Sequence, residues 1–342
     1  MSVSSNALCS KAKAMYGTRI KEDEYLDLCK KRSIEEIVAF LKTKKNYQEV
    51  LENVKADNLR RYTLELTLKE AYFKQWSKLL KYSSNKEISF YLNEIVQVEI
   101  EVLLYKVQML RLNTFESLDY PLPDYIIKKM SFNLYQLLDI PNFDELLSFM
   151  KDTKYYKILY SFKDSIDLNE LSKQLTFLYY DGYISSITSC FKGRMQKELL
   201  NIVYTSIELN TIAKIYRLKK YFNAPKERIQ KEVFIKYNRI PKHLILEMME
   251  AINAEEMMEI LSKSKYQFLI DDDEFIYIEY YIDQIKFNLA KRYMHFSNKA
   301  TIIYIAYCIL SQIEVDNLIH IIEGMRYGKD SKSIEETLIY ES

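Results

Sequence analysis

The strongest constraint on the fold is that the chain repeats itself. Glu36, Glu145 and Glu256 each begin a similar segment, and they lie 109 (145 − 36) and 111 (256 − 145) residues apart. In each segment the glutamate is followed by two apolar residues, a spacer, two more apolar residues and a lysine-rich tail. The tails end at Tyr47, Tyr155 and Tyr266. A fixed period of this kind is typical of a chain built from similar structural units.

A second motif recurs with nearly the same period. Ile207-Glu208-Leu209-Asn210 corresponds to Ile313-Glu314-Val315-Asp316, which lies 106 residues (313 − 207) further on. The first copy has two possible registers, one at Ile100-Glu101 and one at Val98-Glu99. Two copies of the motif are therefore clear, and the third is expected near residue 100.

Proline-containing segments separate the copies. They lie at residues 118–123 and 238–241, and a proline disfavours helix at the residue before it. We therefore expect three tandem repeats, which occupy residues 1–118, 119–238 and 239–342.

The repeats are predicted to be helical. The chain has only five glycines and five prolines among 342 residues, too few for the many turns of a β-sandwich or barrel. Ile37, Phe40 and Leu41 fall on one face of a helix. Capping residues are expected where Ser33 precedes Glu36 and where Asn142 precedes Glu145 by three positions.

Two longer helices are expected in each repeat, for example at 274–295 and 299–325. The acidic run at 271–274 suits the start of the former helix better than a metal site. Gly324 and Gly328 are expected to cap the end of the latter. These features together predict an all-α fold of three helical repeats.

The sequence contains no recognisable catalytic, metal or cofactor motif. No glycine-rich phosphate loop is present, and His243, His295 and His320 do not have the spacing of metal ligands. Cys9, Cys29, Cys190 and Cys308 are widely separated, which favours a reducing cytosolic compartment over a disulfide scaffold. We expect no catalytic residues, no bound metal and no cofactor.

The net charge and hydropathy of the chain limit the kinds of partner that it is expected to bind. The net charge of +1 lacks the basic excess of a dedicated nucleic-acid binder. The basic and aromatic residues at 217–222 are therefore interpreted as a helix end, and Trp76 as part of the core. The longest uncharged run, at 300–313, is shorter than the ~20 residues of a spanning helix, and residues 1–17 lack the apolar core of a signal peptide.

In several motifs the chain resembles the C/d subunit of V-type and A-type rotary ATPases. The resemblance rests on the order and spacing of motifs over the whole chain. They are 6–8 with 12–17 near the start, 207–210 with 217–219 in the middle, and 313–318, 324–328 and 334–338 at the end.

The resemblance implies a structural part of an ion-translocating complex. Three helical lobes about a pseudo-threefold axis would form a hollow funnel that couples the central shaft, made by the D and F subunits, to the proteolipid (c/K) ring. ATP hydrolysis or synthesis in the rest of the complex would thereby be linked to proton or sodium transport. Such a subunit is cytoplasmic and peripheral on the inner face of the membrane, and it binds no nucleic acid.

Interface residues are expected at the last turns of the repeated helices. They are Arg111 in the first copy, Arg217 and Lys219 in the second, and Arg326 and Tyr327 in the third. Two other classes of protein are weighed against the rotor subunit, a helical-repeat scaffold for a soluble partner and a helical nucleic-acid-binding protein. The near-zero net charge argues against the second, and the ordered triple motif argues against both.

Overall fold

The computed structural model describes residues 3–52, 54, 61–112, 122, 124–233, 235–266 and 278–341. Over these residues the chain forms α-helices joined by turns, and none of them lies in a β-strand. The predicted all-α class is confirmed. The funnel about a pseudo-threefold axis stays a prediction.

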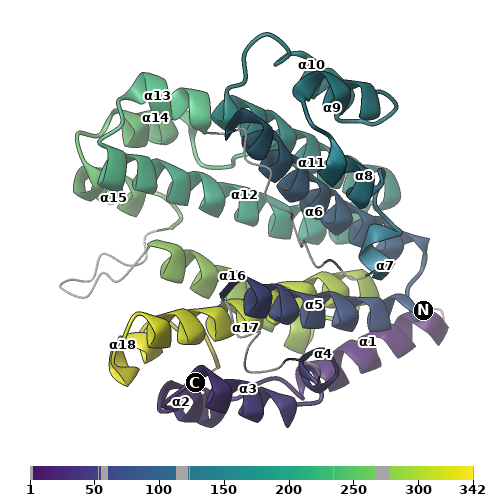
Figure 1. The fold of residues 1–342 in the computed structure, drawn as a ribbon. Helices are drawn as coiled ribbons and strands as arrows, with labels where there is room; N and C mark the ends of the chain where they lie inside the picture. The colour runs from purple at the N-terminus through teal and green to yellow at the C-terminus, as the bar shows by residue number, and fades with distance from the viewer. Residues whose placement is uncertain are drawn as a thin grey trace. The chain divides into compact units, whose positions relative to one another are not determined.

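The chain folds into two compact units, whose helices are labelled in Figure 1. Unit 1 comprises Met1–Ile88 and Asp271–Ser342, so the two ends of the chain fold together, and unit 2 comprises Ser89–Ile270. The two units are defined by contacts between residues in the folded chain. The predicted ranges 1–118, 119–238 and 239–342 are defined by sequence similarity, so the three repeats remain a prediction.

Unit 1 is organised around one buried helix. Its helices are α1 (Val3–Tyr16), α2 (Glu22–Cys29), α3 (Ile34–Lys42), α4 (Gln48–Leu51), α5 (Arg61–Leu80), α16 (Ile278–Phe296), α17 (Ala300–Arg326) and α18 (Ser331–Glu335). Helices α1, α5 and α16 pack against α17. The helix predicted at 299–325 is thus confirmed as α17. The acidic run 271–274 lies outside the described residues.

The burial of α17 accounts for its apolar composition. Among the described helices, α17 alone is long and apolar enough to cross a membrane, and 67% of its most apolar stretch is buried inside the protein. Trp76 on α5 is also buried, with 1% of its surface exposed, which confirms it as a core residue.

Unit 2 pairs three long helices with groups of short ones. It contains most of α6 (Asn85–Leu112), followed by α7 (Asp124–Ile127), α8 (Leu134–Asp139), α9 (Phe143–Phe149), α10 (Tyr156–Tyr160), α11 (Leu168–Cys190), α12 (Gly193–Phe222), α13 (Lys226–Glu232), α14 (Lys242–Glu250) and α15 (Ala254–Ser262). Helices α11 and α15 both pack on α12.

The repeated glutamates start equivalent short helices. Each lies in the first turn of its helix, and its backbone N–H donates to the side chain of the capping residue. The pairs are Ser33 with Glu36 (3.3 Å), Asn142 with Glu145 (2.9 Å) and Asn253 with Glu256 (2.8 Å). The two predicted caps are confirmed, and Asn253 supplies a third.

The end of α17 has the predicted glycine cap. Gly328 has a φ of 67°, and the N–H groups of Gly328 and Lys329 donate to the carbonyls of Met325 and Gly324. This is a Schellman motif, which satisfies the last carbonyls of a helix. Gly324 has a second role, because a Cβ there would lie 2.6 Å from a side-chain atom of Ile334 on α18.

Candidate functional site

The second repeated motif places a buried glutamate on each of three long helices. Each carboxylate contacts a group of short helices that we call a lobe. The first lobe is residues 20–51 and lies against α17, the second is 131–160 and lies against α6, and the third is 239–266 and lies against α12. We call the contact of each lobe with its glutamate the first, second or third junction.

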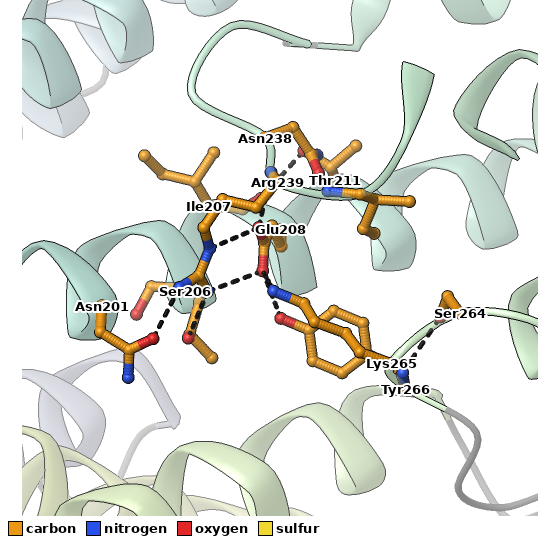
Figure 2. A network of polar contacts seen from close by, with 12 residues as sticks. Asn201, Ser206, Ile207, Glu208, Thr211, Asn238, Arg239, Ser264, Lys265 and Tyr266 are labelled. Carbon is orange, nitrogen blue, oxygen red and sulfur yellow. Dashed lines mark hydrogen bonds and ion pairs between the residues drawn. The ribbon is translucent and has the colours of Figure 1, made fainter. Parts of the chain in front are cut away.

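The third junction has the most hydrogen bonds. Glu208 on α12 has no exposed surface. Its Oε1 accepts hydrogen bonds from the backbone N–H of Arg239 (2.6 Å) and from Arg239 Nε (2.8 Å). Its Oε2 accepts from Arg239 Nη2 (2.9 Å), Lys265 Nζ (2.6 Å) and the Tyr266 hydroxyl (2.5 Å). Figure 2 shows these donors converging on the carboxylate.

These contacts keep Glu208 charged. Burial by itself would raise the pKa of its carboxyl, but the hydrogen bonds from Arg239, Lys265 and Tyr266 outweigh burial and leave the pKa below the ordinary value of 4.5. Arg239 also donates to two acceptors on α12, Asn201 Oδ1 (2.6 Å) and Thr205 Oγ1 (2.8 Å). A buried network with its donors and acceptors paired holds one geometry, so the third lobe is firmly fixed to α12.

The second junction repeats the arrangement with one cation. Glu99 on α6 is 2% exposed. It accepts hydrogen bonds from the backbone N–H of Ser131 and from the Tyr155 hydroxyl. Lys154 Nζ lies 3.5 Å from its Oε2.

The first junction joins the two ends of the chain. Glu314 on α17 accepts hydrogen bonds from the backbone N–H of Ile20 (2.9 Å) and from the Tyr47 hydroxyl (2.6 Å). Within the described part of the chain, no lysine or arginine forms an ion pair with it. Burial raises the pKa of the Glu314 carboxyl, and the two hydrogen bonds lower it by less.

The junctions decide the register of the repeat. Glu99 is buried in the first copy whereas Glu101 is exposed, so the motif begins at Val98-Glu99. With the predicted boundaries 1–118, 119–238 and 239–342, the two partners in each junction come from different copies. The helix of the first copy contacts the lobe of the second, that of the second contacts the lobe of the third, and that of the third contacts the lobe of the first. The repeated tyrosines signalled this contact, but sequence reasoning assigned them no role.

The predicted interface residues have different environments. Arg111 and Arg217 are exposed, Arg326 is half-buried, and Tyr327 is 68% exposed. Lys219 is only 5% exposed, and burial lowers the pKa of its ammonium group. A side chain so placed offers a partner little surface. That these residues lie together at one interface stays a prediction.

The corrected register reveals a repeated pair of surface residues. Twelve residues after the buried glutamate (111 − 99, 220 − 208 and 326 − 314) stands a basic residue, and a large exposed apolar residue follows it. The pairs are Arg111 with Leu112, Lys220 with Tyr221 and Arg326 with Tyr327, and the second members are 61%, 64% and 68% exposed. Lys220 was missed by sequence reasoning, which chose Arg217 and Lys219, residues outside this register.

The chemistry of the site is that of structural contact. Within the described ranges no group of three His, Cys, Asp or Glu side chains is arranged to hold a metal ion. The junction groups bind one another through hydrogen bonds and ion pairs, and of the repeated surface pairs Lys220 forms an ion pair with Glu255 (2.7 Å).

One comparison with known proteins identifies a family. The family model described as ATP synthase (C/AC39) subunit matches residues 8–337, nearly the whole chain. No curated protein matches the sequence.

Proposed function

This chain belongs to the ATP synthase (C/AC39) subunit family, a non-catalytic part of a rotary ATPase, and we propose that it couples the rotor's central shaft to its membrane ring. In this proposal the D and F subunits form the shaft and the proteolipid (c/K) subunits form the ring. ATP hydrolysis or synthesis is thereby linked to proton or sodium transport. The chain would work on the cytoplasmic side, peripheral to the membrane. The family match over residues 8–337 carries the proposal.

The helices support a mechanical role. Torque is lost in a part that bends, so a coupling subunit needs stiff elements. Helices α6, α12 and α17 contain 28, 30 and 27 residues, and an α-helix rises 1.5 Å per residue, so each spans roughly 40 Å. The second and third junctions fix a lobe to α6 and α12 with charge-assisted hydrogen bonds, which are stronger than neutral ones.

The exposed pairs support a contact role. A basic residue beside a large apolar one, repeated on three helix ends, fits an interface that mixes polar and apolar contacts. The alternative interpretation is that these basic residues are ordinary helix-end charges that bind no other protein, since cations are favoured at the C-terminal end of a helix. Binding experiments with variants separate these two interpretations.

The first experiment is a pull-down of the tagged protein from gently solubilised native membranes, with the recovered proteins identified by mass spectrometry. We expect the catalytic head, the D and F shaft subunits and the proteolipids, together with ATPase activity in the eluate. Recovery of none of these from membranes that contain the enzyme would refute the coupling role and favour the scaffold alternative.

Charge-reversal variants then test the exposed pairs. Lys220→Glu and Arg326→Glu should reduce recovery of shaft or ring subunits while the protein stays folded by circular dichroism. Arg194→Glu is the matched control, because Arg194 is exposed at the opposite end of α12, and we expect it to leave recovery unchanged. Arg217→Glu tests the register. A loss with Arg217→Glu but not with Lys220→Glu would show that the pairs were aligned wrongly.

A further inference from the structure

The three junctions differ in how their carboxylates are neutralised. The Glu208 carboxylate forms ion pairs with Arg239 and Lys265, and the Glu99 carboxylate forms one with Lys154. Glu314 has no ion-pair partner among the residues that the structure describes. The position before the junction tyrosine is lysine in the second and third lobes, but in the first lobe it is Asn46.

Arg19, the cation just before the first lobe, is paired elsewhere. Arg19 precedes Ile20, and its guanidinium forms an ion pair with Glu341 near the end of the chain. It also lies over the Tyr16 ring, 4.0 Å from the centroid. Glu341 is held in turn by Lys291, at 3.1 Å. The guanidinium is therefore engaged with the C-terminal segment.

The remaining groups around Glu314 are acids. Tyr47 and Tyr25 face it from the first lobe and Tyr307 from its own helix, and burial raises the pKa of each phenol, so they are neutral. Glu24 of α2 is a further negative charge near the carboxylate, and Lys44 pairs with it. Arg19 forms no ion pair with the carboxylate and acts on it only through its Coulomb field, which lowers the Glu314 pKa by less than burial raises it.

A small cavity lies beside the carboxylate. It has a volume of about 30 Å³, and both Glu314 and Asn46 line it, together with Arg19 and Tyr25. This is room for about one water molecule, which is also the size of an ammonium group. In the other two junctions the lysine before the tyrosine brings its ammonium to the glutamate.

We infer that the first junction is a releasable latch, that is, a contact that opens so that the first lobe separates locally from α17. The second and third junctions stay closed under the same conditions. The buried carboxylate of the latch is held by one phenol and one backbone N–H, without a cation. Burying a charge that lacks a partner is costly, and opening the latch returns the charge to water. The inference does not depend on the proposed coupling role.

The latch responds to pH in a defined direction. Because the pKa of Glu314 is raised above the ordinary 4.5, its protonated form is favoured when the junction is closed. The stabilisation from protonation is complete below pH 4.5 and is lost as the pH rises through the raised pKa. Acidification therefore closes the latch, and alkaline conditions favour opening.

Hydrogen–deuterium exchange of the full chain, read by mass spectrometry and corrected for intrinsic exchange rates, tests the inference. The peptides to compare contain residues 44–51 of the first lobe, 153–160 of the second and 260–266 of the third. At pH 8 we expect the first-lobe peptide to exchange fastest, and its exchange to slow as the pH is lowered to 5.

Two reciprocal substitutions test the cause. Asn46→Lys gives the first junction the lysine of the others and should slow exchange of the first-lobe peptide about tenfold at pH 8. Lys154→Asn gives the second junction the composition of the first and should speed exchange of the second-lobe peptide by a similar factor. Glu314→Gln mimics the protonated form and should remove the pH dependence of the first lobe.

Two results would show that the first junction is not a releasable latch. Exchange in the first lobe as slow as in the third at pH 8 would overturn the inference, as would an Asn46→Lys variant that folds but exchanges at the wild-type rate. Should Asn46→Lys fail to fold, Lys154→Asn still decides the matter, because its side chain is 39% exposed and its loss leaves no cavity in the core. An unchanged second-lobe rate in that variant would mean that the lysine does not control opening.

Discussion

The third junction should make a large contribution to the stability of unit 2, and Glu208→Gln measures it. The substitution keeps the shape of the side chain but removes the charge and turns one acceptor into an NH₂ donor. That donor would face Arg239 and Lys265, which are themselves donors. The two cations would then lack their buried counterion.

The magnitude follows from the exposure of the partners. Breaking a buried ion pair by removing one partner costs about 3–5 kcal/mol. The side chains of Arg239 and Lys265 are 33% and 44% exposed, so water can solvate them in part, and we take the lower end, about 3 kcal/mol. For a unit of the size of Ser89–Ile270, this lowers the Tm by roughly 6–12 °C.

Differential scanning calorimetry at pH 7 provides the measurement, and Tyr266→Phe is the matched control. Tyr266→Phe removes one hydrogen bond to a charged group and leaves both ion pairs, so we expect a smaller loss, of about 1.5 kcal/mol. A Glu208→Gln variant that unfolds within 2 °C of the wild type, or no earlier than Tyr266→Phe, would refute the assignment of this network as the fastening of the third lobe.

Further predictions concern pH and packing. Because the pKa of Glu208 lies below 4.5, the stability it contributes is present above pH 4.5 and lost as the pH falls through the lowered pKa, so the Tm difference between wild type and Glu208→Gln should shrink on going from pH 7 to pH 3.5. Gly324→Ala should destabilise the protein by about 1–3 kcal/mol, since the new Cβ would lie 2.6 Å from a side-chain atom of Ile334. Gly182→Ala within α11 meets no atom within 4 Å and should stabilise it by about 0.5–1 kcal/mol. Chemical denaturation of the two alanine variants checks both signs, and equal effects would contradict the packing argument.

Local features of the fold could be predicted from the sequence. The caps at Ser33 and Asn142 depend on residues three positions apart, and the helix at 299–325 depends on apolar composition and a glycine stop. Each of these signals lies within one element. The structure therefore reproduces them nearly residue for residue, as α17 and the glycine cap at Gly328 demonstrate.

Long-range features could not be predicted in the same way. Tyr47 and Glu314 lie 267 residues apart, and no local pattern links them. Glu99 and Glu101 fit the helix motif almost equally well, and only the position of the second lobe decides between them. Lys220 was overlooked for a different reason: the alignment of Glu208 with Glu314 already places it opposite Arg326, but only the burial of Lys219 (5% exposed) shows which of the two neighbouring lysines faces solvent.

The exchange of partners between copies has an evolutionary consequence. With the predicted boundaries 1–118, 119–238 and 239–342, no copy satisfies its own glutamate, because each carboxylate takes its tyrosine from another copy. A single-copy ancestor could have completed the same contact only with a second polypeptide, as domain-swapped oligomers do. Fusion of the copies into one gene would then have turned contacts between subunits into contacts within a chain. The contact between Glu314 and Tyr47 would be the one that fusion left without a covalent linker.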